Sequence, residues 1–430
     1  MANKFFAFSC FSLLFVLVST ELKFNKDEFE TSYWLKNGRK LIKDALKVKP
    51  IIKKAKNVII FVGDGMGIST VSAARILKGQ MKGMSGVEES FSFEQFPNRA
   101  LIKTYNVDRL VPDSAGTATA FLCGVKASYE SLKVNGKIKS GDTDCEAIEA
   151  NAVKSIMDWA NSARKSTGVV TTTRITHATP AASYASISTR YWESDSDLPA
   201  NLSAKCKDIA KQLIENEPGN KFKVIMGGGR KNFQQQPKGV RKDGLNLLQK
   251  WIDTRKNELL TDSEYQYITT KQELKQLDVN RVKYTLGLFN DDHINYDKNR
   301  TEEEPSLAEM TEAAIRMLKK DENGFVLLVE SGRIDSAHHL NLAAMALHDT
   351  IALDDAVSKA INLTSFDDTL IIVTADHSHS FSVNGYPKRG TSLFGHDNEP
   401  GDRKYPYTVL MYTSGPGHKA VRDNPLLVNT

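Results

Sequence analysis

The stretch VIIFVGDGMG, residues 58–67, decides the fold class of this chain. Its first half, Val58–Val62, is a continuous apolar run, which is typical of a strand buried on both faces of a parallel sheet. Its second half places Asp64 between two glycines at the point where that strand would end. Ligands of open α/β sheets bind at the carboxyl ends of the strands, so we expect Asp64 to lie at a binding site.

Four further apolar runs resemble this one, and helical patterns separate them. The runs are Gly168–Thr173, Lys223–Met226, Phe325–Val329 and Thr369–Thr374. The helical patterns cover Thr70–Lys78, Ala115–Cys123, Ala147–Ala163, Ser306–Lys320 and Leu340–Leu363. This alternation predicts an α/β fold with a central, largely parallel sheet flanked by helices on both faces. Residues 231–300 and 385–430 are polar or rich in proline and glycine, and we expect them to form peripheral excursions from one domain.

The composition and the N-terminal segment indicate an exported globular protein. Of the 430 residues 40% are hydrophobic, which is enough for a large core. The net charge is only +5 and no basic stripe or tail is present, so we expect no nucleic-acid partner. Residues 1–20, with the apolar run Phe5–Val18, predict a secretory signal, which leaves 21–430 as a single α/β domain. We find no later transmembrane segment and no lipid-anchor signal, and therefore expect a secreted protein.

The cysteines and the sequons fit that destination. Cys123 lies in an apolar run, so we expect a buried free thiol. Cys145 and Cys206 lie in polar, loop-like surroundings, and we expect these two to form a disulfide. Three sequons, which begin at Asn201, Asn299 and Asn362, are compatible with glycosylated surface loops.

Acidic residues follow three of the predicted strands. They are Asp64, Glu330 and Asp376. Any one of them could cap the next helix, but three carboxylates at one sheet edge would repel each other unless cations lay among them. The glycines around Asp64 do not have G-x-G-x-x-G spacing, and the aspartate would stand where a pyrophosphate binds. We therefore expect a metal site rather than a nucleotide site.

Histidines accompany two of these acids. Asp335 and His339 are four residues apart at the start of a predicted helix, so they share one face and can chelate a single ion. Asp376 and His377 form a second pair of oxygen and nitrogen ligands. Such mixed sets suit Zn²⁺, whereas sets of oxygen ligands suit Mg²⁺. A lone histidine is usually structural, but this clustering favours metal binding.

A candidate nucleophile lies in the segment Pro112-Asp113-Ser114. Ser114 precedes a predicted helix, where free N–H groups would favour an anion, although an ordinary serine N-cap would look the same. No G-x-S-x-G elbow surrounds Ser114, so metal coordination is the remaining route to activate it. Arg190 follows the strand-like segment Tyr184–Ser188, and its guanidinium could fork onto two phosphate oxygens.

Five stretches of this chain, in family order, resemble the animal-type alkaline phosphatases. They are FVGDGMGISTVSAARILKGQ (61–80), PDSAGTATAFLCG (112–124), TTTRITHATPA (171–181), VESGRIDSAHH (329–339) and VTADHSHSFS (373–382). The resemblance runs from about Tyr33 to Gly417. It implies a parallel sheet between helices, usually in homodimers, and hydrolysis of small phosphomonoester substrates through a phosphoserine intermediate.

By position, the resemblance also implies a role for each motif residue. Ser114 resembles the nucleophile and Arg190 the residue that binds the phosphate. The implied ligands are Asp376, His377, Asp64 and Ser114 for one zinc, Asp335 and His339 for the other zinc, and Asp64, Thr179 and Glu330 for magnesium. His177 resembles a residue beside the magnesium, and His338 is expected to be structural. The Cys145–Cys206 pairing also matches the family.

The chain departs from the family pattern after the fifth motif. The family's third zinc histidine belongs to a later Thr-His-x-Gly-Glu-Asp-like motif that we do not find, and His379, His396 and His418 stand in other contexts. We therefore expect a C-terminally truncated member with one incomplete zinc site and without the last strand of the sheet. The family's calcium site is also in doubt, because the acids near Phe289 and Glu304 do not line up.

Two hypotheses about function follow from this departure. The first is a metal-dependent phosphomonoesterase whose activity the incomplete zinc site impairs. The second is a catalytically silent secreted relative that acts as a binding protein. A sulfatase or a phosphodiesterase of related fold is disfavoured, because neither Cys nor Thr occupies the position of Ser114.

Overall fold

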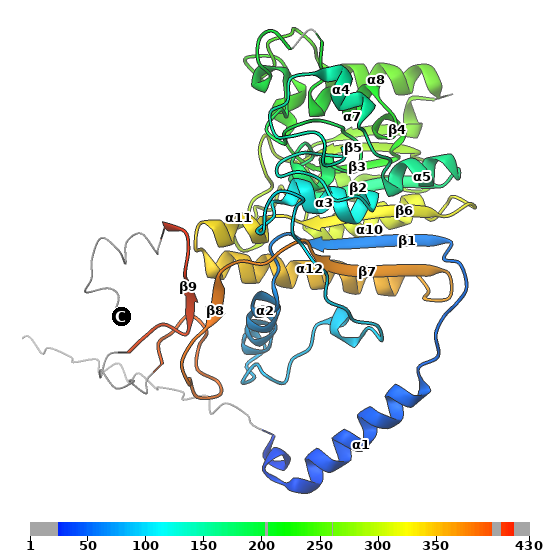
Figure 1. The fold of residues 1–430 in the computed structure, drawn as a ribbon. Coiled ribbons are helices and arrows are strands. Elements are labelled where there is room, and N and C mark those ends of the chain that lie inside the picture. Colours follow the sequence, from blue (N-terminus) through cyan, green and yellow to red (C-terminus); the bar gives the residue numbers. More distant parts are fainter. Residues whose placement is uncertain (1–24, 203–204, 260, 398–405, 417–430) are drawn as a thin grey trace, which may run out of the picture.

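The computed structural model describes residues 25–416 except 203–204, 260 and 398–405, so the expected signal at 1–20 lies outside the described residues. Its centre is a seven-stranded sheet in the order β4-β5-β3-β2-β6-β1-β7 (Figure 1). Every neighbouring pair is parallel, which confirms the predicted fold class. The strands are β1 (Asn57–Gly63), β2 (Ser166–Arg174), β3 (Val224–Gly228), β4 (Tyr265–Ile268), β5 (Tyr284–Leu288), β6 (Phe325–Ser331) and β7 (Thr369–Ala375).

Helices cover both faces of this sheet. In chain order, the described α-helices are α1 (Thr31–Lys47), α2 (Ile68–Met81), α3 (Ser114–Cys123), α4 (Cys145–Ala150), α5 (Ile156–Ser162), α6 (Ala178–Ala181), α7 (Ile209–Glu215), α8 (Leu247–Glu258), α9 (Lys271–Gln276), α10 (Leu307–Leu318), α11 (Arg333–His339) and α12 (Ala343–Leu363). Ile60 and Val62 of β1 pack with residues of α3, α5, α7 and α8, whereas Ile59 and Phe61 pack with α10 and α12. Because successive side chains of a strand point to opposite faces, a strand covered on both sides has to be apolar throughout.

All five predicted strands are present, but residues 231–300 were predicted wrongly as excursions. This region contributes β4 and β5, which extend the parallel sheet beyond β3. Both strands are short, and polar linkers surround them. In β4 only Ile268 is buried, as suits an edge strand, so no continuous apolar run marks it. At the opposite edge, β7 pairs with β1 alone among the described strands.

Two further predictions of local structure were wrong. The helix predicted over Ala147–Ala163 is interrupted between α4 and α5, because Ala152 forms a bridge to Val134 and Ser155 caps the next helix through the N–H groups of Met157 and Asp158. The segment Tyr184–Ser188 is not a strand, since Ile187 forms an isolated bridge to Leu132. In both places side chains and backbone from other segments determine the conformation.

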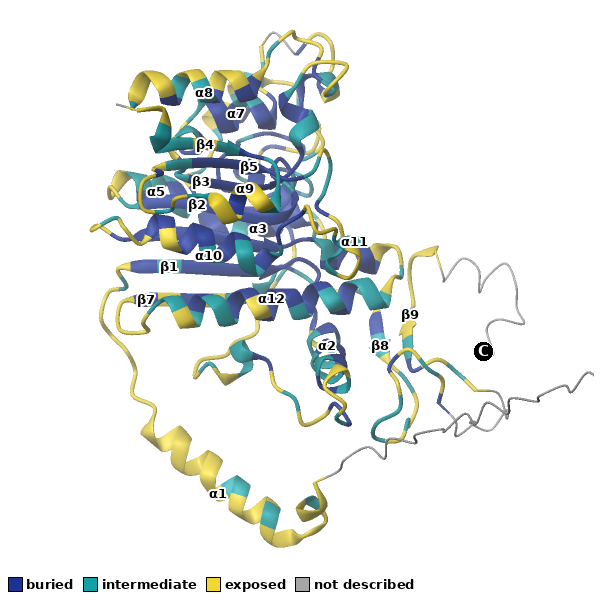
Figure 2. Cartoon of the chain, turned by 180° about the vertical axis from the view of Figure 1, so that it is seen from behind, coloured by how far each residue is buried: buried dark blue, intermediate teal, exposed yellow. Residues whose placement is uncertain are grey.

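Two features lie outside the sheet and its covering helices. The helix α1 projects from the body with no buried residue (Figures 1 and 2). A small antiparallel sheet of β8 (Phe381–Val383) and β9 (Leu410–Tyr412) follows β7.

The predicted Cys145–Cys206 disulfide is present and Cys123 is a buried free thiol, so both predictions are confirmed. In the described ranges, none of the helices is sufficiently long and apolar to cross a membrane.

Candidate active site

The three predicted acids meet at the carboxyl end of the central strands. β6 and β7 flank β1, and Val62, two residues before Asp64, is in register with Glu330 and with Thr374. Asp64, Glu330 and Asp376 are at most 1% exposed. Burial raises the pKa of Asp64 well above its ordinary value, and the charges of Asp376, Asp335 and Glu330 raise it further. Such a set of carboxylates calls for cations.

Ser114 lies against these acids, at the first position of α3. Its Oγ is 3.1 Å from Oδ1 of Asp64 and 3.4 Å from Nε2 of His377. The N-cap of α3 is Asp113, whose carboxylate accepts hydrogen bonds from the N–H groups of Ala115 and Gly116. Ser114 is therefore not an ordinary N-cap, and those two N–H groups are not free for an anion. Its hydroxyl is directed at the candidate metal ligands instead.

A first cluster of candidate ligands consists of Asp64, Ser114, Asp376 and His377. The Nε2 atom of His377 lies 3.4 Å from Oδ1 of Asp64 and 3.5 Å from Oδ2 of Asp376. Ligand atoms that share one tetrahedral zinc ion are separated by about 3.3 Å. The chemistry and the spacing of these atoms therefore fit a zinc ion.

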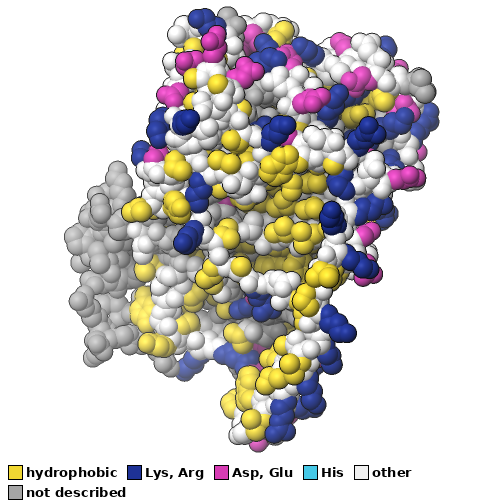
Figure 3. All heavy atoms as spheres, turned by 45° about the vertical axis from the view of Figure 1, so that its right-hand side comes forward, with side chains coloured by type: hydrophobic (Ala, Val, Ile, Leu, Met, Phe, Trp, Pro, Cys, Tyr) yellow, Lys and Arg dark blue, Asp and Glu magenta, His cyan; other side chains and the backbone are white. Residues whose placement is uncertain are grey.

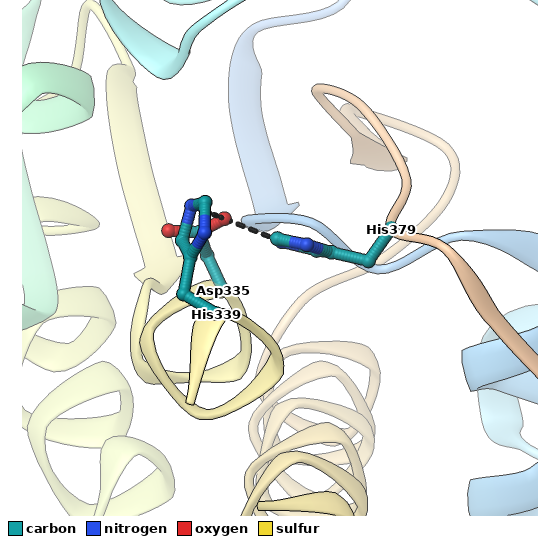
Figure 4. Close-up of side chains that lie close together, drawn as sticks. All are labelled: Asp335, His339 and His379. Carbon is teal, nitrogen blue, oxygen red and sulfur yellow. Dashed lines mark hydrogen bonds and ion pairs between the residues drawn. The ribbon is translucent and has the colours of Figure 1, made fainter. Parts of the chain in front are cut away.

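A second cluster consists of Asp335, His339 and His379 (Figure 4). The Nε2 atom of His339 is 3.3 Å from Oδ1 of Asp335, as two ligands of one ion would be. The Nε2 atom of His379 is only 2.6 Å from the same oxygen, so it donates a hydrogen bond to the carboxylate. Burial alone would raise the pKa of Asp335, but hydrogen bonds from His339 and His379 hold it well below its ordinary value.

Sequence reasoning placed His379 outside the site, yet the structure brings it to Asp335. Gly65 makes room for its imidazole: φ at Gly65 is +68°, and a Cβ there would lie 2.6 Å from Cδ2 of His379. The sequence contains one indication of this arrangement, because His379 follows His377 by two residues in the loop after β7. His338, as expected, is buried and structural, bonded to Thr70 and to Tyr412.

A third cluster is marked by buried oxygen atoms without a hydrogen-bond partner in the described part of the chain. They are Oδ2 of Asp64, Oγ1 of Thr179 and Oε1 of Glu330. Buried polar atoms are nearly always paired, so these three atoms indicate a place for a cation with oxygen ligands, which suits magnesium. Burial raises the pKa of Glu330 to about 7, although Thr171 and Thr173 donate to its other oxygen.

Arg190 and His177 lie beside these clusters. The Nη1 atom of Arg190 is 3.3 Å from Oδ2 of Asp113, and its Nη2 is 2.9 Å from Nε2 of His177. Because a guanidinium only donates, His177 accepts at Nε2 and carries its proton on Nδ1. Burial and the charge of Arg190 lower the pKa of His177 well below its ordinary value, so the ring is neutral. A ring nitrogen of His177 lies within 4.8 Å of carboxylate oxygens of Asp64 and Glu330, so His177 stands at the third cluster.

The comparison with protein families decides the identity of this site. A family model described as alkaline phosphatase matches residues 55–426. The chain belongs to the alkaline phosphatase family. This confirms the resemblance inferred from the five motifs, and it makes the chain a phosphomonoester hydrolase by class.

Curated alkaline phosphatases of animals match over most of this family member. The tissue-nonspecific isozyme of Rattus norvegicus is 45% identical over 421 residues, which cover 94% of this chain and 79% of that protein. The alkaline phosphatase of Gadus morhua is 45% identical over 414 residues, covering 93% and 85%. The membrane-bound alkaline phosphatase of Bombyx mori is 43% identical over 404 residues, covering 91% and 73%.

Solved bacterial alkaline phosphatases share the fold. The enzyme of the Antarctic bacterium TAB5 has a TM-score of 0.63 at 27% identity, over 84% of this chain and 88% of that one. The enzyme of Thermus thermophilus has a TM-score of 0.63 at 29% identity, over 79% and 63%. A histidine-to-aspartate variant of the TAB5 enzyme carries magnesium in a site called M3. Alkaline phosphatases are thus metal-binding enzymes, and this chain has donor sets that could hold ions.

Proposed function

We propose that this chain hydrolyses phosphate monoesters through a phosphoserine intermediate at Ser114, in a site for two zinc ions and one magnesium ion. The observation that carries the proposal is the position of the Ser114 hydroxyl, 3.1 Å from Asp64 and 3.4 Å from His377. Because both neighbours are candidate ligands of one cation, that cation would also coordinate the hydroxyl and activate Ser114 as a nucleophile.

The three clusters assign the ligands. Asp64, Ser114, Asp376 and His377 would hold one zinc, Asp335 and His339 the other, and Asp64, Thr179 and Glu330 the magnesium, with His177 beside it. When bound, these cations neutralise the phosphate dianion, favour the serine alkoxide and stabilise the leaving oxygen.

The side chains of the chain itself have defined tasks in this scheme. Arg190 binds two phosphate oxygens and holds the phosphorus in line with Oγ of Ser114. Its guanidinium is oriented for this by Asp113 on one side and by His177 on the other. Oγ of Ser114 attacks phosphorus while the bond to the leaving oxygen breaks, and water then cleaves the phosphoserine from the opposite side. Recognition is centred on the phosphate, so many leaving groups are accepted.

Hydrolysis of p-nitrophenyl phosphate at alkaline pH, with added zinc and magnesium, tests this proposal. We expect turnover by the native chain and loss of turnover in Ser114→Ala, with an unchanged melting temperature in the variant. Phosphate incorporation into the native protein at low pH, absent from the variant, would identify the intermediate. Equal, negligible rates for both proteins would overturn the proposal and favour a silent binding protein.

We further propose that the protein is secreted and that residues 21–430 form one domain.

We also propose that the protein forms a homodimer. Apolar side chains lie along α1, next to basic ones (Figure 3), and Trp34, Leu41 and Leu46 are more than half exposed. Leu110 and Val111, which precede the nucleophile segment, are 95% and 78% exposed. Apolar surface of this extent is typical of a protein–protein interface. Light scattering of the native protein and of Leu110→Asp tests the dimer, which we expect the variant to weaken.

A further inference from the structure

A buried threonine joins the helix of the nucleophile to one of the candidate zinc ligands. Thr117 lies three residues after Ser114 on α3 and is 4% exposed. Its Oγ1 is 2.9 Å from Oδ2 of Asp376 and 3.0 Å from the backbone oxygen of Asp113, so its one hydroxyl proton is shared between two acceptors. The side chain of Thr117 therefore touches a residue that is 259 positions away in the sequence and belongs to the loop after β7.

The contacts of Asp376 show what this hydroxyl does. Oδ1 of Asp376 accepts hydrogen bonds from the backbone N–H groups of Gly65 and His377, at 3.0 and 2.8 Å. Oδ2 accepts from Thr117, and it is also the oxygen that lies 3.5 Å from Nε2 of His377. The two backbone donors fix one oxygen of the carboxylate, and the threonine hydroxyl fixes the plane in which the other lies.

Few other hydrogen bonds connect these two segments. Within the described ranges, the second hydrogen bond between α3 and the loop after β7 joins Ser114 to His377, at 3.4 Å. That contact involves two candidate ligands of the same ion and would change when the ion binds. The Thr117–Asp376 hydrogen bond uses no candidate ligand atom of α3, so it connects the helix to Asp376 independently of the Ser114 hydroxyl.

We propose that Thr117 is a positioning residue, whose hydroxyl orients the carboxylate of Asp376 toward the ion that activates Ser114. This inference rests on the proposed function, because it concerns the zinc assigned to Asp64, Asp376 and His377. Groups that orient a metal ligand typically change metal affinity or activity by about 10- to 100-fold when they are removed. Thr117 would act through Asp376, to which its hydroxyl is hydrogen-bonded.

Three variants test this role. Thr117→Val removes the hydroxyl and keeps the shape, and Thr117→Ser keeps the hydroxyl. Thr119→Val is the matched control, because Thr119 is also buried on α3 but its hydroxyl bonds to Ala115 and Lys133, away from the site. The primary measurement is the zinc affinity of the purified full chain, obtained by competition with a chelator of known affinity. Melting temperature and the kcat/KM of p-nitrophenyl phosphate hydrolysis are measured alongside.

We expect Thr117→Val to bind its zinc about 10- to 100-fold more weakly and to lose kcat rather than raise KM, because the phosphate is held by Arg190. Thr117→Ser and Thr119→Val should retain native zinc affinity, whatever their melting temperatures. The inference would be overturned if Thr117→Val bound zinc within about twofold of the native affinity, or if Thr117→Val and Thr119→Val lost zinc affinity equally. In either case, turnover by the native chain would leave the proposed function intact. Failure of the native chain to bind zinc would overturn both.

Discussion

Oδ1 of Asp64 lies 3.1 Å from Oγ of Ser114, although 50 residues separate the two in the sequence. The other oxygen, Oδ2, has no hydrogen-bond partner among the described residues and belongs to the third cluster with Thr179 and Glu330. One fully buried carboxylate therefore faces the nucleophile with one oxygen and the candidate magnesium site with the other. This arrangement makes Asp64 the residue on which two of the three clusters depend.

Replacement of Asp64 by asparagine should remove ions from two clusters at once. Asp64→Asn keeps the shape but removes the negative charge, so we expect loss of one zinc and of the magnesium and a fall in kcat/KM of on the order of 100-fold or more. Elemental analysis after dialysis checks the metal content, and p-nitrophenyl phosphate hydrolysis checks activity. Asp367→Asn, at an exposed turn, is the matched control. A full metal complement in Asp64→Asn would contradict the ligand assignment.

Arg190 should determine affinity for phosphate more than it determines stability. Lysine in Arg190→Lys keeps the charge but cannot form the two parallel hydrogen bonds to phosphate or contact Asp113 and His177 together. We expect the inhibition constant of inorganic phosphate to rise by about 10- to 100-fold, with KM rising in parallel. The exposed Arg281 supplies the control variant Arg281→Lys. Unchanged inhibition by phosphate in Arg190→Lys would show that another group binds the substrate.

His379 should strengthen ion binding at the second cluster. Its Nε2 atom is too close to Asp335 for the two to be ligands of one ion, but it is hydrogen-bonded to that carboxylate. In His379→Gln the short hydrogen bond to Asp335 is lost or lengthened, so we expect zinc affinity at Asp335 and His339 to fall by about 10- to 100-fold. Zinc titration should then show one tight site and one weakened site. His396→Gln, at an exposed position, should titrate like the native protein. Two tight sites in His379→Gln would refute the role of this histidine.

The stability of the metal-free protein should depend on pH through Glu330. Burial raises the pKa of Glu330 to about 7 in the folded state, so between pH 4.5 and 7 the folded state binds a proton that the unfolded state has released. The free energy of unfolding should therefore be highest below the ordinary pKa and fall as pH rises through 7. Urea unfolding of the chelator-treated protein at pH 5 and pH 8 measures this difference.

Glu330→Gln should reduce that pH dependence, because glutamine stays neutral throughout. Part of the dependence should remain, because burial also raises the pKa of Asp64 well above its ordinary value and that of Asp349 to about 8. Glu302→Gln is the control, since the side chain of Glu302 is fully exposed. Addition of Mg²⁺ at pH 8 should restore stability to the native protein but less so to Glu330→Gln. The same pH dependence in both the native protein and Glu330→Gln would show that other groups are responsible.

The sheet was predictable where its strands are buried on both faces. β1, β2, β3 and β6 are buried on both faces, so their sequences are runs with few charged residues. β7 is also an apolar run, although it is an edge strand in which Leu370 and Ile372 are 47% and 39% exposed. β4 is a half-buried edge strand and has no continuous apolar run. β5 is buried, but it is only 5 residues long and contains Thr285 and Gly287, so it was not recognised. The break between α4 and α5 could not be predicted either, because it depends on the bridge from Ala152 to Val134 in another segment.

The types of candidate ligand in the site can be recognised from local sequence, but their relative positions cannot. The sequence predicted metal ions from acids at the ends of apolar runs and from Asp335 and His339, which are spaced to share one helix face. By contrast, the contacts of His379 and Thr117 depend on how the loop after β7 packs against α11 and α3. For His379 the sequence gives one indication, its position two residues after His377, and for Thr117 it gives none. The spacing of apolar residues reflects the local geometry of strands and helices and the burial of their faces, so it can be recognised along the chain. Which oxygen faces which nitrogen follows from the order of strands in the sheet, because only the packed chain brings β1, β6 and β7 side by side.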